Sequence, residues 1–133
     1  MIPDAPSDPP RKRLQLPSGP VTWTEEGQGP PLVCLHGLPG SVRDFRWLAP
    51  AVGSGMRTIR LDLPGFGGTP LATWGGSKLP ARADFVSAVL DELDLGPVIL
   101  LGHSMGGAVA AAVAARRPDL VSYIPAVATR RMT

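Results

Sequence analysis

The chain is poor in cysteine and histidine. Its 133 residues include one cysteine, Cys34, and two histidines. An internal disulfide is therefore excluded, and so is a metal site built from several cysteines. Cys34 lies inside the apolar run 32–35, which is typical of a buried thiol on a strand. We expect the chain to bind no metal and no cofactor.

Long hydrophobic runs are also missing. No stretch approaches the roughly 18 apolar residues that a transmembrane helix needs. The N-terminus carries no apolar run of signal-peptide length, and its charges follow prolines. The sequence therefore predicts no membrane-spanning segment, no membrane partner and a cytoplasmic location.

Charge is sparse, with 13 basic and 11 acidic residues and a net charge of +2. The positive excess lies near the two ends, in residues 11–13 and at Arg130 and Arg131, so the body between them has no basic face. The cluster at 11–13 is shorter than the roughly 5–8 basic residues of a nucleic-acid patch. We expect a solvated tail there and no nucleic-acid partner.

Proline and glycine are abundant, with 16 of each, which predicts many turns. Residues 1–12 are rich in proline and poor in large apolar side chains, the composition of a disordered tail. Residues 13–124 carry the apolar patterns of a folded domain. These patterns stop at Pro125, so residues 125–133 are expected to form an atypical C-terminal tail.

Strand and helix patterns alternate through residues 13–124. Alternating or fully apolar short runs predict strands, and apolar residues at helical spacing predict helices. Strands are expected at 14–16, 21–24, 32–35, 57–61 and 98–101, with a weaker one at 120–124, and helices at 42–52, from Pro80 to a stop at Gly96, and at 104–117. This order is typical of an α/β fold with a doubly wound, mostly parallel sheet, led here by an antiparallel strand pair and accompanied by three main helices.

The strand at 98–101 runs into Gly102-His103-Ser104-Met105-Gly106. A strand, a sharp turn and a helix with Gly-x-Ser-x-Gly at the corner form a nucleophile elbow, which lifts the serine clear of the sheet. The glycines leave room where side chains would collide with the neighbouring strand and helix. The helix directs free N–H groups at a developing oxyanion, and the N–H of Met105 is the expected first donor. An ordinary serine N-cap is the structural alternative.

A second loop, His36-Gly37-Leu38-Pro39-Gly40, follows the apolar run 32–35. A buried strand ends there and the chain turns sharply, so the N–H of Leu38 is the expected second oxyanion donor. His36 could be taken for a catalytic base, but at this position we expect it to hold the loop in place.

A glycine-rich stretch at residues 65–68 raises the alternative of nucleotide binding. It does not fit the G-x-G-x-x-G pattern, because Pro70 stands at the last glycine position, and no P-loop lysine follows. Nucleotide binding is therefore not expected.

Taken with the motif Asp62-Leu63-Pro64-Gly65-Phe66-Gly67, the two loops resemble those of the α/β-hydrolase family, over residues 21–121. The resemblance implies cleavage of an ester, amide or related acyl bond in a small-molecule substrate. It implies Ser104 as the nucleophile and the amides of Leu38 and Met105 as the oxyanion hole. It also implies supporting roles in the elbow and loops, with Asp62 structural rather than the triad acid, for His36, Gly37, Asp62, Gly102, His103 and Gly106.

The sequence departs from the family after the nucleophile. The family's triad runs serine, acid, histidine along the chain, but no histidine follows Ser104 and the only acid that follows is Asp119. Asp119 comes after the expected helix, roughly 20 Å away at about 1.5 Å per residue. His103 is adjacent to Ser104, and neighbouring side chains leaving a strand point to opposite sides. The triad acid and histidine are therefore missing from these residues.

We expect the chain to be the N-terminal part of an α/β-hydrolase domain with an incomplete sheet. Truncation, a split gene or a frameshift would each produce such a chain, and a second polypeptide could supply the missing half. Its own turnover is expected to be nearly absent, because a serine hydroxyl without a base is a weak nucleophile. The alternative is a non-catalytic binding or interaction module on a hydrolase-like scaffold.

Overall fold

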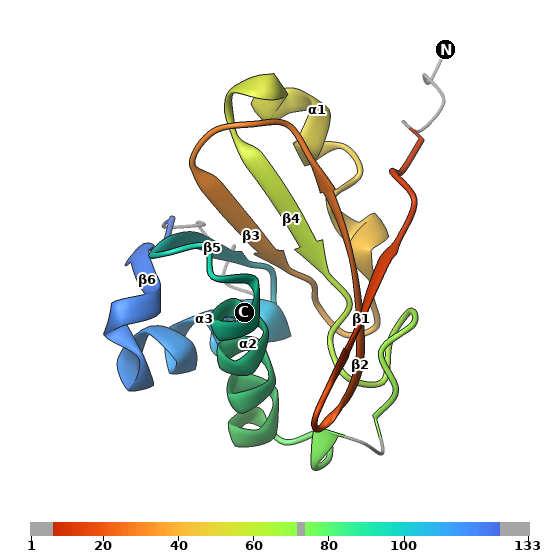
Figure 1. Ribbon diagram of the computed structural model, residues 1–133, viewed down its shortest axis with the longest axis vertical. Coiled ribbons are helices and arrows are strands. Elements are labelled where there is room, and N and C mark those ends of the chain that lie inside the picture. Colours follow the sequence, from red (N-terminus) through yellow and green to blue (C-terminus); the bar gives the residue numbers. More distant parts are fainter. Residues whose placement is uncertain (1–6, 72–73, 126–133) are drawn as a thin grey trace, which may run out of the picture.

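The computed structural model describes residues 7–71 and 74–125. A six-stranded sheet runs through them in the order β1-β2-β4-β3-β5-β6 (Figure 1). Its strands are β1 (Lys12–Leu16), β2 (Gly19–Glu26), β3 (Pro31–Leu35), β4 (Arg57–Leu61), β5 (Val98–Gly102) and β6 (Val121–Tyr123). β2 pairs antiparallel with β1 and with β4, whereas β4, β3, β5 and β6 run parallel. The predicted fold class, a mostly parallel sheet led by an antiparallel pair, is confirmed.

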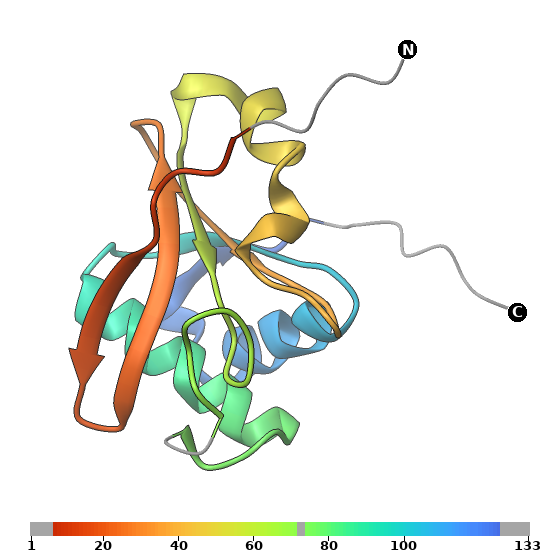
Figure 2. The same ribbon diagram turned by 90° about the vertical axis from the view of Figure 1, so that its right-hand side faces the viewer.

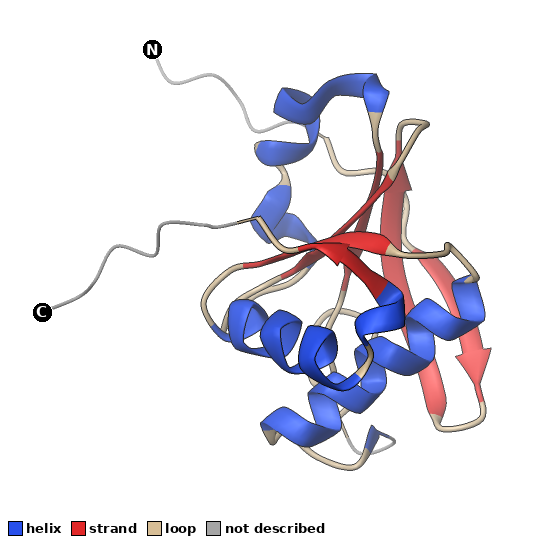
Figure 3. Cartoon of the chain, turned by 90° about the vertical axis from the view of Figure 1, so that its left-hand side faces the viewer, coloured by secondary structure: helices blue, strands red, loops and turns tan. Residues whose placement is uncertain are grey.

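Two long helices, α2 (Leu79–Leu93) and α3 (Met105–Arg116), lie on one face of the sheet (Figure 3). They bury one set of alternating side chains from the strands, because successive residues of a strand point to opposite faces. The fully buried members of this core include Val33, Leu35, Ile59, Leu61, Val86, Leu100, Val109 and Val113. Each such side chain contributes roughly 1.5–3 kcal/mol of burial free energy.

A segment of short helices covers part of the opposite face, in three pieces: η1 (Val42–Phe45), α1 (Leu48–Val52) and η2 (Gly53–Gly55). The prediction of one continuous helix over 42–52 is therefore wrong. Pro50 has no N–H to donate to the carbonyl of Arg46, so a helix that begins at residue 42 cannot run through it without a break. Pro50 is tolerated inside the first turn of the separate helix α1, where its missing donor has no partner to satisfy.

Within residues 7–71 and 74–125, no element covers the part of this second face near the β6 edge. Register places Leu101 beside Cys34 and Tyr123 beside Ile99, so all four side chains share the face that carries α1. Cys34 is buried under Phe45, but Leu101 is only half-buried and Tyr123 is 59% exposed. Apolar surface at an open sheet edge is unusual for a folded domain on its own.

The ends of several elements differ from those predicted. α2 ends at Leu93, three residues before the predicted stop at Gly96, and Asp94 after it has the left-handed conformation (φ 49°, ψ 50°). Lys12 already belongs to β1, and two other residues of the predicted tail 1–12, Asp8 and Arg11, form ion pairs with the domain. Residues 126–133 of the predicted C-terminal tail lie outside the described residues. None of the helices in the described ranges is long and apolar enough to cross a bilayer.

Candidate active site

Ser104 occupies the corner between β5 and α3. Its backbone has φ 55° and ψ −117°, and it is one of two residues other than glycine with positive φ among the described residues. Such a conformation costs on the order of 1–3 kcal/mol and persists only where its surroundings enforce it. Because the turn is this sharp, the Ser104 side chain is exposed beyond the end of the strand.

Two glycines make the turn possible through close packing. A Cβ on Gly106 would lie 2.0 Å from the carbonyl oxygen of Leu35, and a Cβ on Gly102 would lie 2.1 Å from the carbonyl oxygen of Gly106. Neither position can hold a side chain unless the backbone moves. The Gly-x-Ser-x-Gly spacing therefore reflects the contact of α3 with β3 and with the end of β5.

The loop after β3 lies directly against this corner. A Cβ on Gly37 would be 3.2 Å from the Cβ of Ser104 and 3.0 Å from Nδ1 of His103. The His103 N–H donates to the Leu35 carbonyl at 3.0 Å, which ties the corner to the end of β3. The structure thus brings together the two segments in which the sequence predicted the nucleophile and the oxyanion donors.

The N–H groups of the two residues predicted as oxyanion donors make no hydrogen bond among the described residues. The N–H groups of Gly106 and Gly107 donate to the carbonyls of His103 and Ser104, but the Met105 N–H has no partner among the described residues. The Leu38 N–H likewise has no partner within these residues, and Leu38 is 61% exposed. Unsatisfied N–H groups at a helix start and on an adjacent loop are the arrangement that stabilises a developing oxyanion.

His36 is fully buried and fixes the loop after β3. Its Nε2 accepts the Leu63 N–H at 2.9 Å, so Nδ1 carries the proton and donates to the Gly37 carbonyl at 2.8 Å. Its ring meets Phe66 edge-on at 5.1 Å. Burial lowers the pKa of His36, although its hydrogen bond to Gly37 acts in the opposite direction. With both nitrogens bonded to the backbone, the imidazole holds two loops together and is not free to take a proton from Ser104.

Asp62 is also fully buried, at the end of β4. Oδ2 accepts hydrogen bonds from Arg11 Nε at 2.8 Å and Thr22 Oγ1 at 2.6 Å, and Oδ1 accepts the Val42 N–H at 3.0 Å. Burial alone would raise the pKa of Asp62, but the bonds from Arg11, Thr22 and Val42 outweigh it and the pKa is lowered. Each oxygen is engaged, as expected for a carboxylate that organises loops.

The sequence over residues 30–132 matches the family model of the alpha/beta hydrolase fold. The chain belongs to the α/β-hydrolase family. Its six-stranded order and its exposed serine at a strand-to-helix corner are those expected of a member of this family.

Proteins similar to this chain are considerably longer. The pimeloyl-[acyl-carrier protein] methyl ester esterase of Aeromonas hydrophila is 40% identical over 103 residues, which make up 77% of this chain and 39% of that protein. The dihydrolipoyllysine-residue acetyltransferase component of the acetoin cleaving system of Pseudomonas putida is 39% identical over 111 residues, 82% of this chain and 30% of that protein. The crystal structure of E-2-(acetamidomethylene)succinate hydrolase has a TM-score of 0.81 at 27% identity, covering 89% of this chain and 44% of that one. The chain thus spans less than half of each protein.

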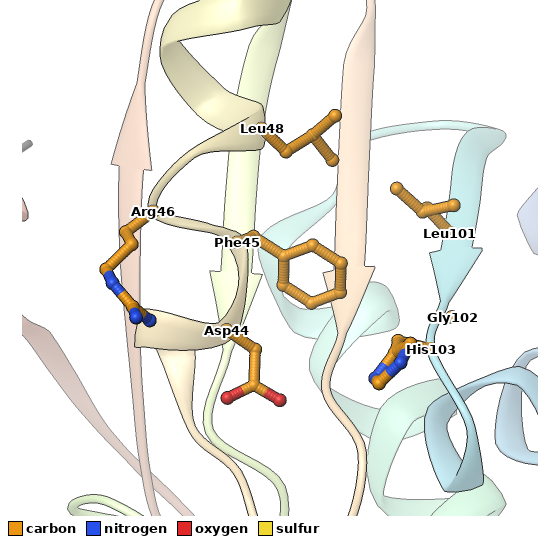
Figure 4. Close-up of a pocket in the computed structure, with 7 residues that line it drawn as sticks. All are labelled: Asp44, Phe45, Arg46, Leu48, Leu101, Gly102 and His103. Carbon is orange, nitrogen blue, oxygen red and sulfur yellow. The ribbon is translucent and has the colours of Figure 1, made fainter. Parts of the chain in front are cut away.

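A cavity of about 530 Å³ opens beside the elbow, on the α1 side of the sheet (Figure 4). Figure 4 shows its apolar side chains coming from η1 and α1 on one side and from β5 on the other. It is lined by Asp44, Phe45, Arg46, Leu48, Leu101, Gly102 and His103. Ser104 is not among these residues, so the cavity extends beside the corner of this α/β-hydrolase rather than over its serine.

The Ser104 hydroxyl has no hydrogen-bond partner within residues 7–71 and 74–125. Asp119 comes after the far end of α3, where its carboxylate pairs with Arg117 at 2.9 Å. That hydrogen bond lowers the pKa of Asp119. Among all the residues that the structure describes, no group of three His, Cys, Asp or Glu side chains lies close enough together to hold a metal ion.

Sequence reasoning missed two residues that support the site. Asp44 accepts the Gly37 N–H at 3.3 Å and forms a capping box with Ser41. The spacing Ser-x-x-Asp before an apolar position is a helix-start signal that could have revealed Asp44. Arg11 is bonded to Asp62 across 51 residues of sequence, and no local pattern indicates that contact.

Proposed function

We propose that this chain supplies the nucleophile and the oxyanion hole of a serine hydrolase. Ser104 Oγ attacks the carbonyl carbon of an ester or amide, and an acyl-serine intermediate forms as the alcohol or amine leaves. The oxygen that becomes negative in the tetrahedral intermediate accepts hydrogen bonds from the N–H groups of Leu38 and Met105. The observation that carries this proposal is the strained, exposed Ser104 (φ 55°), packed against Gly37 of the loop that holds Leu38.

The proton of the Ser104 hydroxyl requires a base that these residues do not supply. His36 has both nitrogens bonded to the backbone, and Asp119 is paired with Arg117 after the far end of α3. Loss of a triad member costs serine hydrolases about 10⁴-fold in rate or more. A polypeptide of these 133 residues is therefore nearly inactive on its own, and the triad acid and histidine come from a further part of the hydrolase fold or from a second polypeptide.

The uncovered part of the sheet supports completion by further protein. The cavity beside the elbow has apolar walls from Phe45, Leu48 and Leu101, and Tyr123 is exposed beside it at the open edge. A sheet edge with exposed apolar surface invites pairing or coverage by another segment. Gly102 and His103, the two residues before Ser104, also line this cavity. A segment that covers this face would therefore lie close to Ser104.

The names of two similar proteins support hydrolysis of an ester or amide bond. One is a methyl ester esterase and another is a hydrolase of E-2-(acetamidomethylene)succinate. We therefore assign ester or amide hydrolysis to the completed site, without a cofactor.

A chimaera tests this function directly. Residues 7–121, which include Asp8 and Arg11, replace the matching segment of the Aeromonas hydrophila esterase, which then supplies its own C-terminal part. We expect the folded chimaera to hydrolyse p-nitrophenyl butyrate, and Ser104→Ala to abolish that activity. Ser18→Ala serves as the matched control, because it removes an exposed hydroxyl in the turn between β1 and β2 but leaves the nucleophile. Circular dichroism and thermal melting establish that each variant is folded.

The second candidate function is a non-catalytic binding or interaction module. The absence of any hydrogen-bond partner for the Ser104 hydroxyl within the described residues favours it, because an activated serine is bonded to its base. A chimaera that melts cooperatively but shows no turnover dependent on Ser104 would support the module and contradict the hydrolase.

A further inference from the structure

Two charged residues ahead of β1 reach into the domain. Asp8 Oδ1 pairs with Arg60 Nη1 at 2.8 Å and Asp8 Oδ2 with Arg43 Nη1 at 2.6 Å, while Arg11 Nε pairs with Asp62 Oδ2 at 2.8 Å. Figure 2 shows the start of the described chain passing beside the short helices before it enters β1. We call residues 8–11 the N-terminal strap.

Two of the charged side chains that pair with the strap, Arg60 and Asp62, are buried. The Arg60 side chain is 2% exposed and that of Asp62 is fully buried. A buried charge is stable only when it is paired and hydrogen-bonded. Glu26 also pairs with Arg60 at 2.9 Å, and Thr22 also donates to Asp62, so the strap completes two buried polar clusters rather than forming isolated surface pairs.

Both clusters hold the turn Val42–Phe45. Asp62 Oδ1 accepts the Val42 N–H at 3.0 Å, and Arg60 Nη1 donates to the Val42 carbonyl at 3.1 Å. Arg43, the next residue of the turn, pairs with Asp8. The turn is therefore fixed from β4 and from the strap at the same time.

The Val42–Phe45 turn also holds the loop at residues 36–40, which contains Leu38 and is called the oxyanion loop below. Asp44 accepts the Gly37 N–H and the Ser41 N–H, each at 3.3 Å. A Cβ on Gly40 would lie 2.5 Å from the Asp44 carboxylate, so the loop is packed tightly around this side chain. Gly37 directly precedes Leu38, the proposed oxyanion donor.

We propose that the N-terminal strap is a positioning element for the oxyanion loop. Asp8 and Arg11 fix the Val42–Phe45 turn through Arg43, Arg60 and Asp62, and Asp44 on that turn sets the Gly37–Leu38 segment against Ser104. Arg11 and Asp8 act through other residues and touch no substrate. That this positioning serves catalysis rests on the proposed function. That the strap holds the Gly37–Leu38 segment in place does not depend on it.

Amide hydrogen exchange on the intact chain tests the link. Arg11→Met keeps the apolar stem of the side chain but removes its charge-assisted hydrogen bond to Asp62. We expect amide exchange at Gly37 and Val42 to accelerate by roughly tenfold or more, because this segment then opens locally more often. Exchange at Val86 and Leu100 in the core should stay within about twofold. Arg116→Met is the matched control: it removes an exposed pair with Asp84 and should leave Gly37 and Val42 unchanged.

The outcomes separate the strap from the hydrolase. The strap proposal is contradicted if exchange at Gly37 and Val42 is unchanged in Arg11→Met. It is also contradicted if the core amides accelerate equally. If Arg11→Met does not fold, Asp8→Asn removes the other end of the strap and is scored at the same two amides. Local acceleration combined with a folded but inactive chimaera would retain the strap and reject the hydrolase.

Discussion

Gly106 packs directly against the carbonyl oxygen of Leu35, so that a Cβ at this position would lie 2.0 Å from it. This contact joins the first turn of α3 to the end of β3 and sets the sharpness of the corner at Ser104. A helix can begin there only if its second residue has no side chain.

The contact predicts opposite effects for two neighbouring glycines. Gly106→Ala forces the backbone apart, and we expect a loss of about 3 kcal/mol or more in the free energy of unfolding, at the upper end of overpacking costs. Gly107→Ala places its Cβ 3.5 Å from the nearest atom, an ordinary contact. That variant should gain about 0.5–1 kcal/mol, because alanine is the better helix residue. Urea unfolding of both proteins measures the difference, and similar losses in the two would contradict the packing described.

The burial of His36 predicts a pH dependence of stability. Its pKa is lowered in the folded protein from the ordinary value of 6.5. The unfolded chain therefore takes up the proton first as the pH falls below about 6.5, and stability declines through that range. The charged groups that face His36 are Asp44, Asp62 and Arg82. In His36→Gln these groups remain, but the decline between about pH 6.5 and 5 should disappear.

His103→Gln is the control for this titration, because it also removes one histidine but from an exposed position. Free energies of unfolding from urea titrations across this pH range give the slopes. If His36→Gln keeps the slope of the original protein and His103→Gln loses it, the assignment to His36 is wrong.

The burial of Cys34 predicts an inert thiol. Burial raises its pKa to about 12, so very little thiolate is present near neutral pH. Alkylation by iodoacetamide in native buffer should be far slower than in urea, where the thiol is exposed. Mass spectrometry of timed samples follows the reaction. Rapid stoichiometric alkylation of the folded chain would show that β3 is not buried beneath Phe45.

The fold was predictable where burial imposes a simple pattern. β4 and β5 are continuous apolar or alternating runs because each lies inside the sheet, and the strand predicted at 57–61 has the bounds observed for β4. α2 was predictable from the buried stripe that includes Phe85, Val86 and Val89. The segment at 42–52 misled the same reasoning, because its apolar spacing is helical while Pro50 prevents a continuous hydrogen-bond ladder.

The candidate site was predictable only in part, because some of its residues form a local motif and others meet only in the folded chain. Ser104 and the glycines around it form a local motif whose spacing is set by one turn of backbone. Asp44 and Arg11 act across the fold: Arg11 meets Asp62 only because β1 and β2 place it beside the end of β4. Pairing of this kind depends on tertiary structure, and no periodicity in the sequence records it.

Fluorophosphonate labelling of Ser104 tests the central assignment most directly. The 133-residue chain and the folded chimaera are treated side by side, and peptide mass spectrometry locates the modified residue and gives its rate. We predict labelling at Ser104 in the chimaera at a rate about 10³-fold or more above that of the chain alone, because under the proposed function the C-terminal part of the esterase supplies the base for the serine. Equal labelling of both proteins would show that the base lies within these residues. A folded chimaera that is not labelled at Ser104 would contradict its role as the nucleophile.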